Sequence, residues 1–134
     1  MIMEIEKIFK NLILADFIVI ILMVISSMYQ PSEISNLYEN LNDGLLSNFE
    51  NFSRIISISL FFLYLFTLNL LYRFIYYGKS LYLFIIVAGL LLNYFNGSVI
   101  YTAYGGILDQ IGGIISGAIL VLLYFSPVKE NFKR

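Results

Sequence analysis

Long apolar runs separated by short polar stretches dominate this chain. A helix needs roughly 20 mostly apolar residues to cross about 30 Å of hydrocarbon, and the runs at residues 8–28, 55–77, 80–95 and 107–125 approach that length. The third run is the shortest, and it stops at Asn96-Gly97, a pair typical of turns. The pattern predicts an all-α integral membrane protein, a four-transmembrane-helix bundle in a single domain, residues 1–134.

Glycine and proline mark the expected ends of these helices. Gly78 and Lys79 lie between the second and third runs, so they predict a tight turn and an antiparallel hairpin. Gly105-Gly106 marks the entry to the fourth helix, and Pro127 ends it because proline cannot donate the next helical hydrogen bond. Residues 127–134 are then a short cytoplasmic tail.

The connection between the first two runs has a helical pattern of its own. Within residues 31–52 the apolar side chains recur at helical spacing, and the other face carries Asn, Glu, Asp and Ser. Pro31 suits a first helical position. The pattern predicts an amphipathic helix on the outer membrane surface. It either covers the end of the bundle or docks another membrane subunit.

Composition agrees with a membrane protein. Hydrophobic residues make up 60% of the chain and charged residues 13%, and the mean hydropathy is +0.84, outside the usual range of a water-soluble domain. The lipid bilayer is therefore the first expected partner. Asp16 interrupts the first run, which continues without a cleavage site of the secretory type, so we interpret this run as a retained helix.

The cations predict an orientation. In a four-span arrangement Arg54 alone falls on the outer side, and the other Lys and Arg residues fall on the opposite side. The positive-inside rule then places both termini in the cytoplasm of a bacterial inner membrane. Tyrosines near the helix ends fit the headgroup level. On the inner side these are Tyr72, Tyr76, Tyr77, Tyr82 and Tyr124.

The residues that most enzymes and metal sites need are missing. The chain has no His and no Cys, which excludes thiolate catalysis, haem ligation through His, disulfides and the usual zinc sites. It has no phosphate-binding loop and no H-E-x-x-H pattern. Asp16 and Asp109 lie about 10 Å apart along the membrane normal at 1.5 Å per residue, too far for a carboxylate dyad. We expect no enzyme, no cofactor, no metal and no nucleic-acid partner.

Asp16 is the most informative polar residue. A carboxylate at membrane depth is costly and usually turns toward the bundle interior or a partner. Asp16 lies about 12 Å from the start of the first run, and Asn69 of the second run comes out at a similar depth by the same count. Arg73 lies one turn closer to the cytoplasm. The sequence therefore predicts an intramembrane polar cluster of Asp16, Asn69 and Arg73.

This cluster has two interpretations. In the first, Asp16 accepts hydrogen bonds from Asn69 and pairs with Arg73, and the three residues tie two helices together. In the second, Arg73 extends to the interface and leaves Asp16 as a desolvated acid that exchanges a proton or a cation. The sequence favours the tie and leaves the second interpretation open.

A stripe of small and polar residues follows the fourth helix. Asp109, Gly113, Ser116 and Gly117 share one face, and the G-x-x-x-G of Gly113 and Gly117 is typical of close helix packing. Asn93 of the third helix could hydrogen-bond across the bundle to this stripe. These residues predict a modestly polar interior, either as packing contacts or as a wetted path.

Two classes of function fit these observations. The preferred one is a non-catalytic accessory or scaffold subunit of a larger membrane complex, or a small homo-oligomer. The alternative is a small proton- or cation-coupled transporter or channel that uses Asp16. Four helices with one acid in the first resemble the small multidrug resistance transporters, a likeness that implies a dimer in which this acid couples proton and cation. The chain departs from that family in carrying Asp for Glu, a long outer segment and no Trp.

Overall fold

A computed structural model describes residues 2–29, 31–33, 36, 47–95 and 102–132, and every regular element in these residues is helical. The four long helices are each long and apolar enough to cross a membrane, as predicted. A 3-10 helix follows the last of them. The elements are α1 (Ile2–Met28), α3 (Ser47–Tyr72), α4 (Tyr76–Phe95), α5 (Ala103–Phe125) and η1 (Pro127–Phe132).

All four long helices begin earlier than the apolar runs do, α1 and α5 among them. α1 begins at Ile2, so its first turns carry the polar residues before residue 8. α5 begins at Ala103, where the hydroxyl of Thr102 accepts a hydrogen bond from the Gly105 N–H at 3.0 Å and caps the helix. Gly105-Gly106 therefore lies inside α5. The predicted start at residue 107 was wrong because a threonine cap outweighs the low helix propensity of two glycines.

The turn between α3 and α4 lies at Arg73–Ile75 rather than at Gly78-Lys79. Phe74 has a φ of 56°, in the left-handed region. The Phe74 N–H donates to the Leu71 carbonyl at 3.0 Å, and the Ile75 N–H donates to the Leu70 carbonyl at 2.9 Å. This pair of bonds is the Schellman arrangement that closes many helices, usually with glycine where Phe74 stands.

Gly78 does not form the predicted turn, because it lies within α4. It is buried in the first turns of α4, and a Cβ atom there would lie 3.0 Å from the Leu70 Cβ and 3.2 Å from backbone atoms of α3. The glycine allows the two helices to approach closely just after the turn. Sequence alone does not separate this role from that of a turn glycine, because both need the missing side chain.

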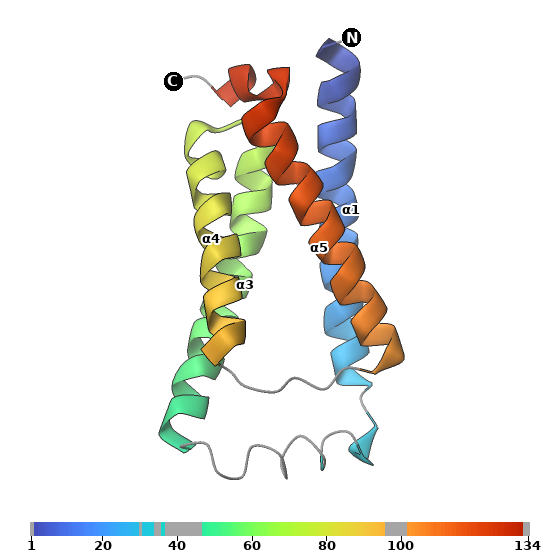
Figure 1. Ribbon diagram of the computed structural model, residues 1–134, viewed down its shortest axis with the longest axis vertical. Helices are drawn as coiled ribbons and strands as arrows, with labels where there is room; N and C mark the ends of the chain where they lie inside the picture. Colours follow the sequence, from blue (N-terminus) through green and yellow to red (C-terminus); the bar gives the residue numbers. More distant parts are fainter. Residues whose placement is uncertain (1, 30, 34–35, 37–46, 96–101, 133–134) are drawn as a thin grey trace.

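The helices form two antiparallel pairs. α1 packs mainly on α5, α3 packs mainly on α4, and the pairs contact each other chiefly through α1 and α3. Figure 1 shows both termini and the α3–α4 turn at one end, which we call the terminal end. The opposite end, the loop end, is where α1 and α5 lie apart from α3 and α4 (Figure 1). The pairs therefore converge toward the terminal end.

The buried core lies in the terminal half of the bundle. Phe9 of α1, Phe74 of the turn and Phe132 of η1 pack as a ring cluster, with centroids 5.3–6.0 Å apart. Residues 127–132, expected as part of a short cytoplasmic tail, form η1, which packs on the bundle because Val128 and Phe132 are buried. The buried apolar core is Phe9, Ile13, Leu68, Leu71, Tyr82, Ile119, Leu123, Val128 and Phe132.

The outward faces of the helices are apolar and exposed. Ile18, Phe62 and Leu90 are each more than half exposed, an arrangement that suits contact with hydrocarbon chains. Most of the predicted outer helix, residues 31–52, lies outside the described residues. Its last part, residues 47–52, belongs to α3.

Candidate functional site

Asp16 is buried where the four helices meet. Only 1% of it is exposed, and the Tyr64 hydroxyl donates a hydrogen bond to its Oδ2 at 2.5 Å. The Tyr64 hydroxyl also lies 3.3 Å from the Tyr82 hydroxyl and 3.3 Å from the Ser116 hydroxyl. We call these four residues the Asp16 cluster. They come from α1, α3, α4 and α5 in that order, so each long helix contributes one side chain.

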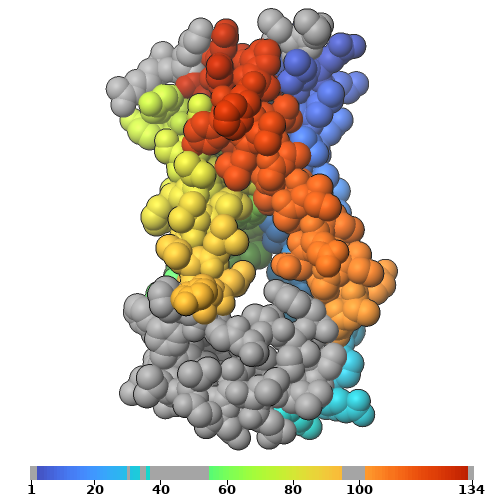
Figure 2. All heavy atoms as spheres, viewed as in Figure 1, coloured from blue at the N-terminus to red at the C-terminus, as the bar shows by residue number. Residues whose placement is uncertain are grey.

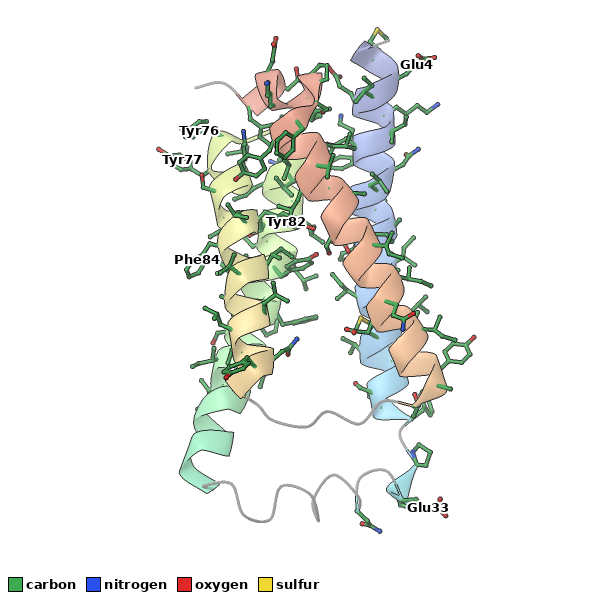
Figure 3. All side chains as sticks on the ribbon, viewed as in Figure 1. Glu4, Glu33, Tyr76, Tyr77, Tyr82 and Phe84 are labelled. Carbon is green, nitrogen blue, oxygen red and sulfur yellow. The ribbon has the colours of Figure 1, made fainter. Side chains whose placement is uncertain are left out.

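Helical spacing places each of these residues on an inward face. Asp16 continues the buried stripe of Phe9 and Ile13 on α1, at steps of four and three. Tyr64 precedes Leu68 and Leu71 on α3 in the same way. On α4 and α5, Tyr82 and Ser116 each lie three residues before a buried isoleucine, at 85 and 119. In Figure 3 Tyr82 is on the side of α4 that faces the bundle, whereas Tyr77 and Phe84 point away.

The hydrogen atoms of the cluster can be assigned by counting. Tyr64 has one hydroxyl hydrogen, and its bond to Asp16 uses it. Toward Tyr82 and Ser116 the Tyr64 oxygen must therefore accept, so these two hydroxyls donate. In this arrangement all three hydroxyl hydrogens point toward the carboxylate. Neutral donors, rather than a cation, thus compensate the charge of Asp16.

The same heavy-atom positions accommodate a proton on Asp16. A protonated carboxyl group donates to the Tyr64 oxygen, and Tyr64 then donates to Tyr82 or Ser116. Only the direction of the hydrogen bonds changes, and no side chain has to move. The cluster can therefore accommodate Asp16 both as a carboxylate and as a carboxylic acid. Within the described part of the chain no three His, Cys, Asp or Glu residues gather as a metal site.

Asn69 and Arg73 do not belong to the Asp16 cluster. Both are exposed and line a groove between α1 and α3, and the hydrogen bond that Asp16 accepts comes from Tyr64. The depth count had no information on helix rotation, and the α3 residue that contacts Asp16 is Tyr64, five residues before Asn69. Asn69 follows the buried pair Thr67 and Leu68 by one residue, which turns it about 100° away from Leu68.

The polar residues predicted to face one another on α4 and α5 differ in their surroundings. Ser116 joins the Asp16 cluster, while Asp109 and Asn93 are exposed. A Cβ atom added at Gly113 or Gly117 would meet nothing within 4 Å, so the G-x-x-x-G pair packs against no other described helix. Gly112 beside it faces Val19 of α1, whose Cγ1 would lie 3.6 Å from an added Cβ.

Sequence reasoning missed both tyrosines of the cluster. Tyr82 was expected at the headgroup level, yet it is fully buried. Tyr124 was expected there too, but its hydroxyl donates to the Lys79 carbonyl at 3.4 Å, and the Lys79 Nζ lies 4.3 Å from its ring centroid. The available signal was that Tyr64 lies well inside its apolar run, too deep for an interfacial position.

The surface is hollowed on the loop side of the Asp16 cluster. Figure 2 shows a hollow between α4 and α5, below the level at which the two helices come together. Gly89 and Asn93 are seven and eleven residues beyond Tyr82 on α4, and Asp109 and Gly113 precede Ser116 by seven and three on α5. Such spacings repeat on one helix face. These residues therefore share the helix faces of Tyr82 and Ser116, and Asn93, Asp109 and Gly113 are exposed there.

In the part of the chain that the structure describes, the fold and the site combine four long helices with an apolar exterior and one buried, tyrosine-bound carboxylate. The chain matches no protein-family model, no curated protein and no solved structure. Its function is therefore inferred from the geometry above.

Proposed function

We propose that the chain is an integral membrane protein of the bacterial inner membrane with both termini in the cytoplasm. Four helices of sufficient length and apolar exposed faces support insertion. Lysine and arginine gather toward the terminal end, on the first turns of α1, the α3–α4 turn and η1, which supports a cytoplasmic position for that end.

The proposed role is non-catalytic, and the Asp16 cluster carries the proposal. It joins the α1/α5 pair to the α3/α4 pair through one contact from every helix. Among the described residues no buried side-chain polar atom lacks a hydrogen-bond partner, so the carboxylate is accommodated as a structural tie. Such a tie specifies how the helix pairs meet in a membrane, where apolar burial alone does not.

Within this role the chain acts as a scaffold or accessory subunit of a larger membrane complex, or as a small homo-oligomer. The surface beside Gly113 and Gly117 supports association with another helix. A glycine pair of this spacing allows close helix packing, and no other described helix of the chain packs there. The amphipathic helix proposed in residues 31–52 gives a second surface for another subunit or a cover for the bundle.

Purification in mild detergent tests this role. We expect a stoichiometric membrane-protein partner, or a defined multimer of this chain, by size-exclusion chromatography with light scattering and mass spectrometry. Gly113→Ile should disrupt that assembly and leave the helical circular dichroism spectrum unchanged. Ile114→Leu, at an exposed neighbouring position, is the matched control. A monodisperse monomer without partners would contradict the proposal.

A second function is favoured by the hollow between α4 and α5. The hollow lies between the two helices that carry Tyr82 and Ser116 (Figure 2), whose hydroxyls lie 3.3 Å from the Tyr64 hydroxyl that bonds Asp16. A carboxyl group that can take up a proton without side-chain movement suits proton- or cation-coupled transport. In this function the aromatic cluster of Phe9, Phe74 and Phe132 closes the cytoplasmic side.

Asp16→Asn separates the two functions. The amide oxygen still accepts the Tyr64 hydrogen bond, so the fold is kept while the ionisable group is lost. If the protein is a transporter, the substitution abolishes a proton-linked flux in liposomes and leaves assembly intact. If the protein is a scaffold, wild-type liposomes show no such flux, and the substitution has little effect on the assembly.

A further inference from the structure

A groove opens between α1 and α3 on the membrane-facing surface. It encloses about 340 Å³ and is bounded by both helices. Its apolar lining includes Leu14 and Phe17, which are 48% and 43% exposed, so the groove is open to the surroundings of the bundle. Asn69, Tyr72 and Arg73 add polar groups to its wall. The groove is separate from the Asp16 cluster, none of whose residues lines it.

The polar groups lie at one end of the groove. α3 runs toward the terminal end, so Arg73 is nearest that end and Leu65 is deepest, about 12 Å away at 1.5 Å per residue. On α1, which runs the opposite way, Ile13 lies toward the terminal end and Phe17 deeper. The groove is therefore charged near the membrane boundary and apolar below it, as a phospholipid is.

Arg73 lines the charged end of the groove, and Lys10 lies beside it, over the rings of the residues on either side of Arg73. The Lys10 Nζ lies 5.2 Å from the ring centroid of Tyr72, which lines the groove beside Arg73. Within the described residues neither Lys10 nor Arg73 forms an ion pair. Asn69 adds amide hydrogens on the same wall. This end thus offers two positive charges and further donors to a phosphate, and no carboxylate lines the groove among the described residues.

We propose that this groove binds one anionic phospholipid, with its phosphate between Lys10 and Arg73 and an acyl chain against Leu14, Phe17 and Leu65. Charge complementarity selects the headgroup, because basic pockets between membrane helices on the cytoplasmic side bind anionic lipids. The depth of the apolar part selects a lipid over a water-soluble phosphate. Lipid bound here bridges α1 and α3, the two helices through which the helix pairs contact each other.

Native mass spectrometry and thermal unfolding of the purified full chain test this proposal. The probe is phosphatidylglycerol, compared with phosphatidylcholine of the same acyl chains. The wild-type protein should retain one phosphatidylglycerol and unfold at a higher temperature in its presence. Arg73→Gln and Lys10→Gln should each weaken binding about fivefold, corresponding to roughly 1 kcal/mol per cation near a membrane surface. Lys129→Gln, an exposed cation on η1, should leave binding unchanged.

A second variant separates the groove from general surface charge. Leu14→Trp fills the apolar part and keeps both cations, so it should reduce retention of phosphatidylglycerol. If a substitution impairs folding, the wild-type protein alone still tests the proposal. It should retain one phosphatidylglycerol molecule after detergent exchange. Equal retention of both lipids, equal losses for Lys129→Gln and Arg73→Gln, or full binding by Leu14→Trp would overturn the proposal.

The source of the phosphate is tested with glycerol phosphate and inorganic phosphate. Neither should protect the protein from thermal unfolding at concentrations at which phosphatidylglycerol does. Protection by either one would show that the cations bind a free anion and that the groove has no lipid role. This result would leave the proposed scaffold role untouched, because assembly is measured independently.

Discussion

Among the described residues Asp16 is held by a cluster of three hydroxyl groups, which separates it from the ion pair with Arg73 expected from the sequence. Each hydroxyl comes from a different helix, and the shortest of their hydrogen bonds is the one that Tyr64 donates to the carboxylate. The Tyr82 hydroxyl acts on Asp16 through the Tyr64 oxygen, whereas Ser116 contacts both Tyr64 and the carboxylate. The contributions of the three residues should therefore differ, even though all are hydroxyl groups at similar depth.

Tyr64→Phe should destabilise the protein by about 1–2 kcal/mol, because it removes the donor to a buried carboxylate. Tyr82→Phe removes only a donor to Tyr64 and should cost about 0.6 kcal/mol, the average for such bonds in membranes. Tyr77→Phe, at a 67% exposed position, is the control and should be neutral. Unfolding in mixed detergent micelles, followed by circular dichroism, measures all three. Equal effects of Tyr64→Phe and Tyr77→Phe would contradict the assignment.

The sequence identified Asp16 but not its partners. A lone carboxylate in an apolar run is recognisable from the sequence. Its burial at membrane depth costs free energy whichever way its helix is rotated. Its partner depends on the rotation of a second helix, and a depth count contains no rotation. Tyrosine adds to the difficulty, since the same residue type suits a headgroup position and a buried hydrogen bond.

At the scale of elements, the α3–α4 connection is where local preference and packing disagree. Phe74 adopts a left-handed conformation that favours glycine, and its ring packs on Phe9 and Phe132. Gly78, which local preference assigns to a turn, is helical. Tertiary contacts therefore decide the position of this turn. The four apolar spans were predictable from the sequence because length and hydropathy are local properties, whereas the turn is not.

Two substitutions of Phe74 test the turn. Both Phe74→Ala and Phe74→Gly should lower stability by about 3 kcal/mol or more, because each removes a packed ring. Phe74→Gly should be the more stable of the two by about 1 kcal/mol, because glycine carries no penalty at positive φ. Unfolding midpoints give the order. If the alanine variant is the more stable, residue 74 is in a right-handed helix and the turn lies elsewhere.

Gly78→Ala tests the close approach of α4 to α3. An added methyl group would lie 3.0 Å from the Leu70 Cβ, so we expect a loss of about 1–3 kcal/mol from overpacking. Gly89→Ala, in the same helix with nothing within 4 Å, should be neutral or gain about 0.5–1 kcal/mol through helix propensity. The same unfolding assay serves both variants. A neutral Gly78→Ala would show that the helices are further apart.

At the scale of the whole molecule, two helix pairs meet in the terminal half and lie apart at the loop end (Figure 1). The Asp16 cluster is at the junction of the pairs, and the groove of Lys10 and Arg73 lies on another side of it. The pairing of helices could not be read from the sequence. All four helices are apolar around most of their circumference, so hydrophobic periodicity does not choose a neighbour.

Labelling of single cysteines tests the proposed topology. The chain has no cysteine of its own, so Lys129→Cys and Asp43→Cys each create a unique site. In intact cells a membrane-impermeant maleimide should label the cysteine at 43 and spare the one at 129. Labelling of 129 in intact cells would reverse the orientation, and protection of both sites would exclude a spanning arrangement with a 31–52 segment outside.

The central claim is that Asp16 ties the two helix pairs through Tyr64 and not through Arg73. A double-mutant cycle measures it most directly, with Asp16→Ala combined in turn with Tyr64→Phe and with Arg73→Gln, and free energies of unfolding determined in the same mixed micelles. We expect a coupling energy of about 1 kcal/mol for Asp16 with Tyr64 and none for Asp16 with Arg73. Coupling to Arg73 without coupling to Tyr64 would contradict it.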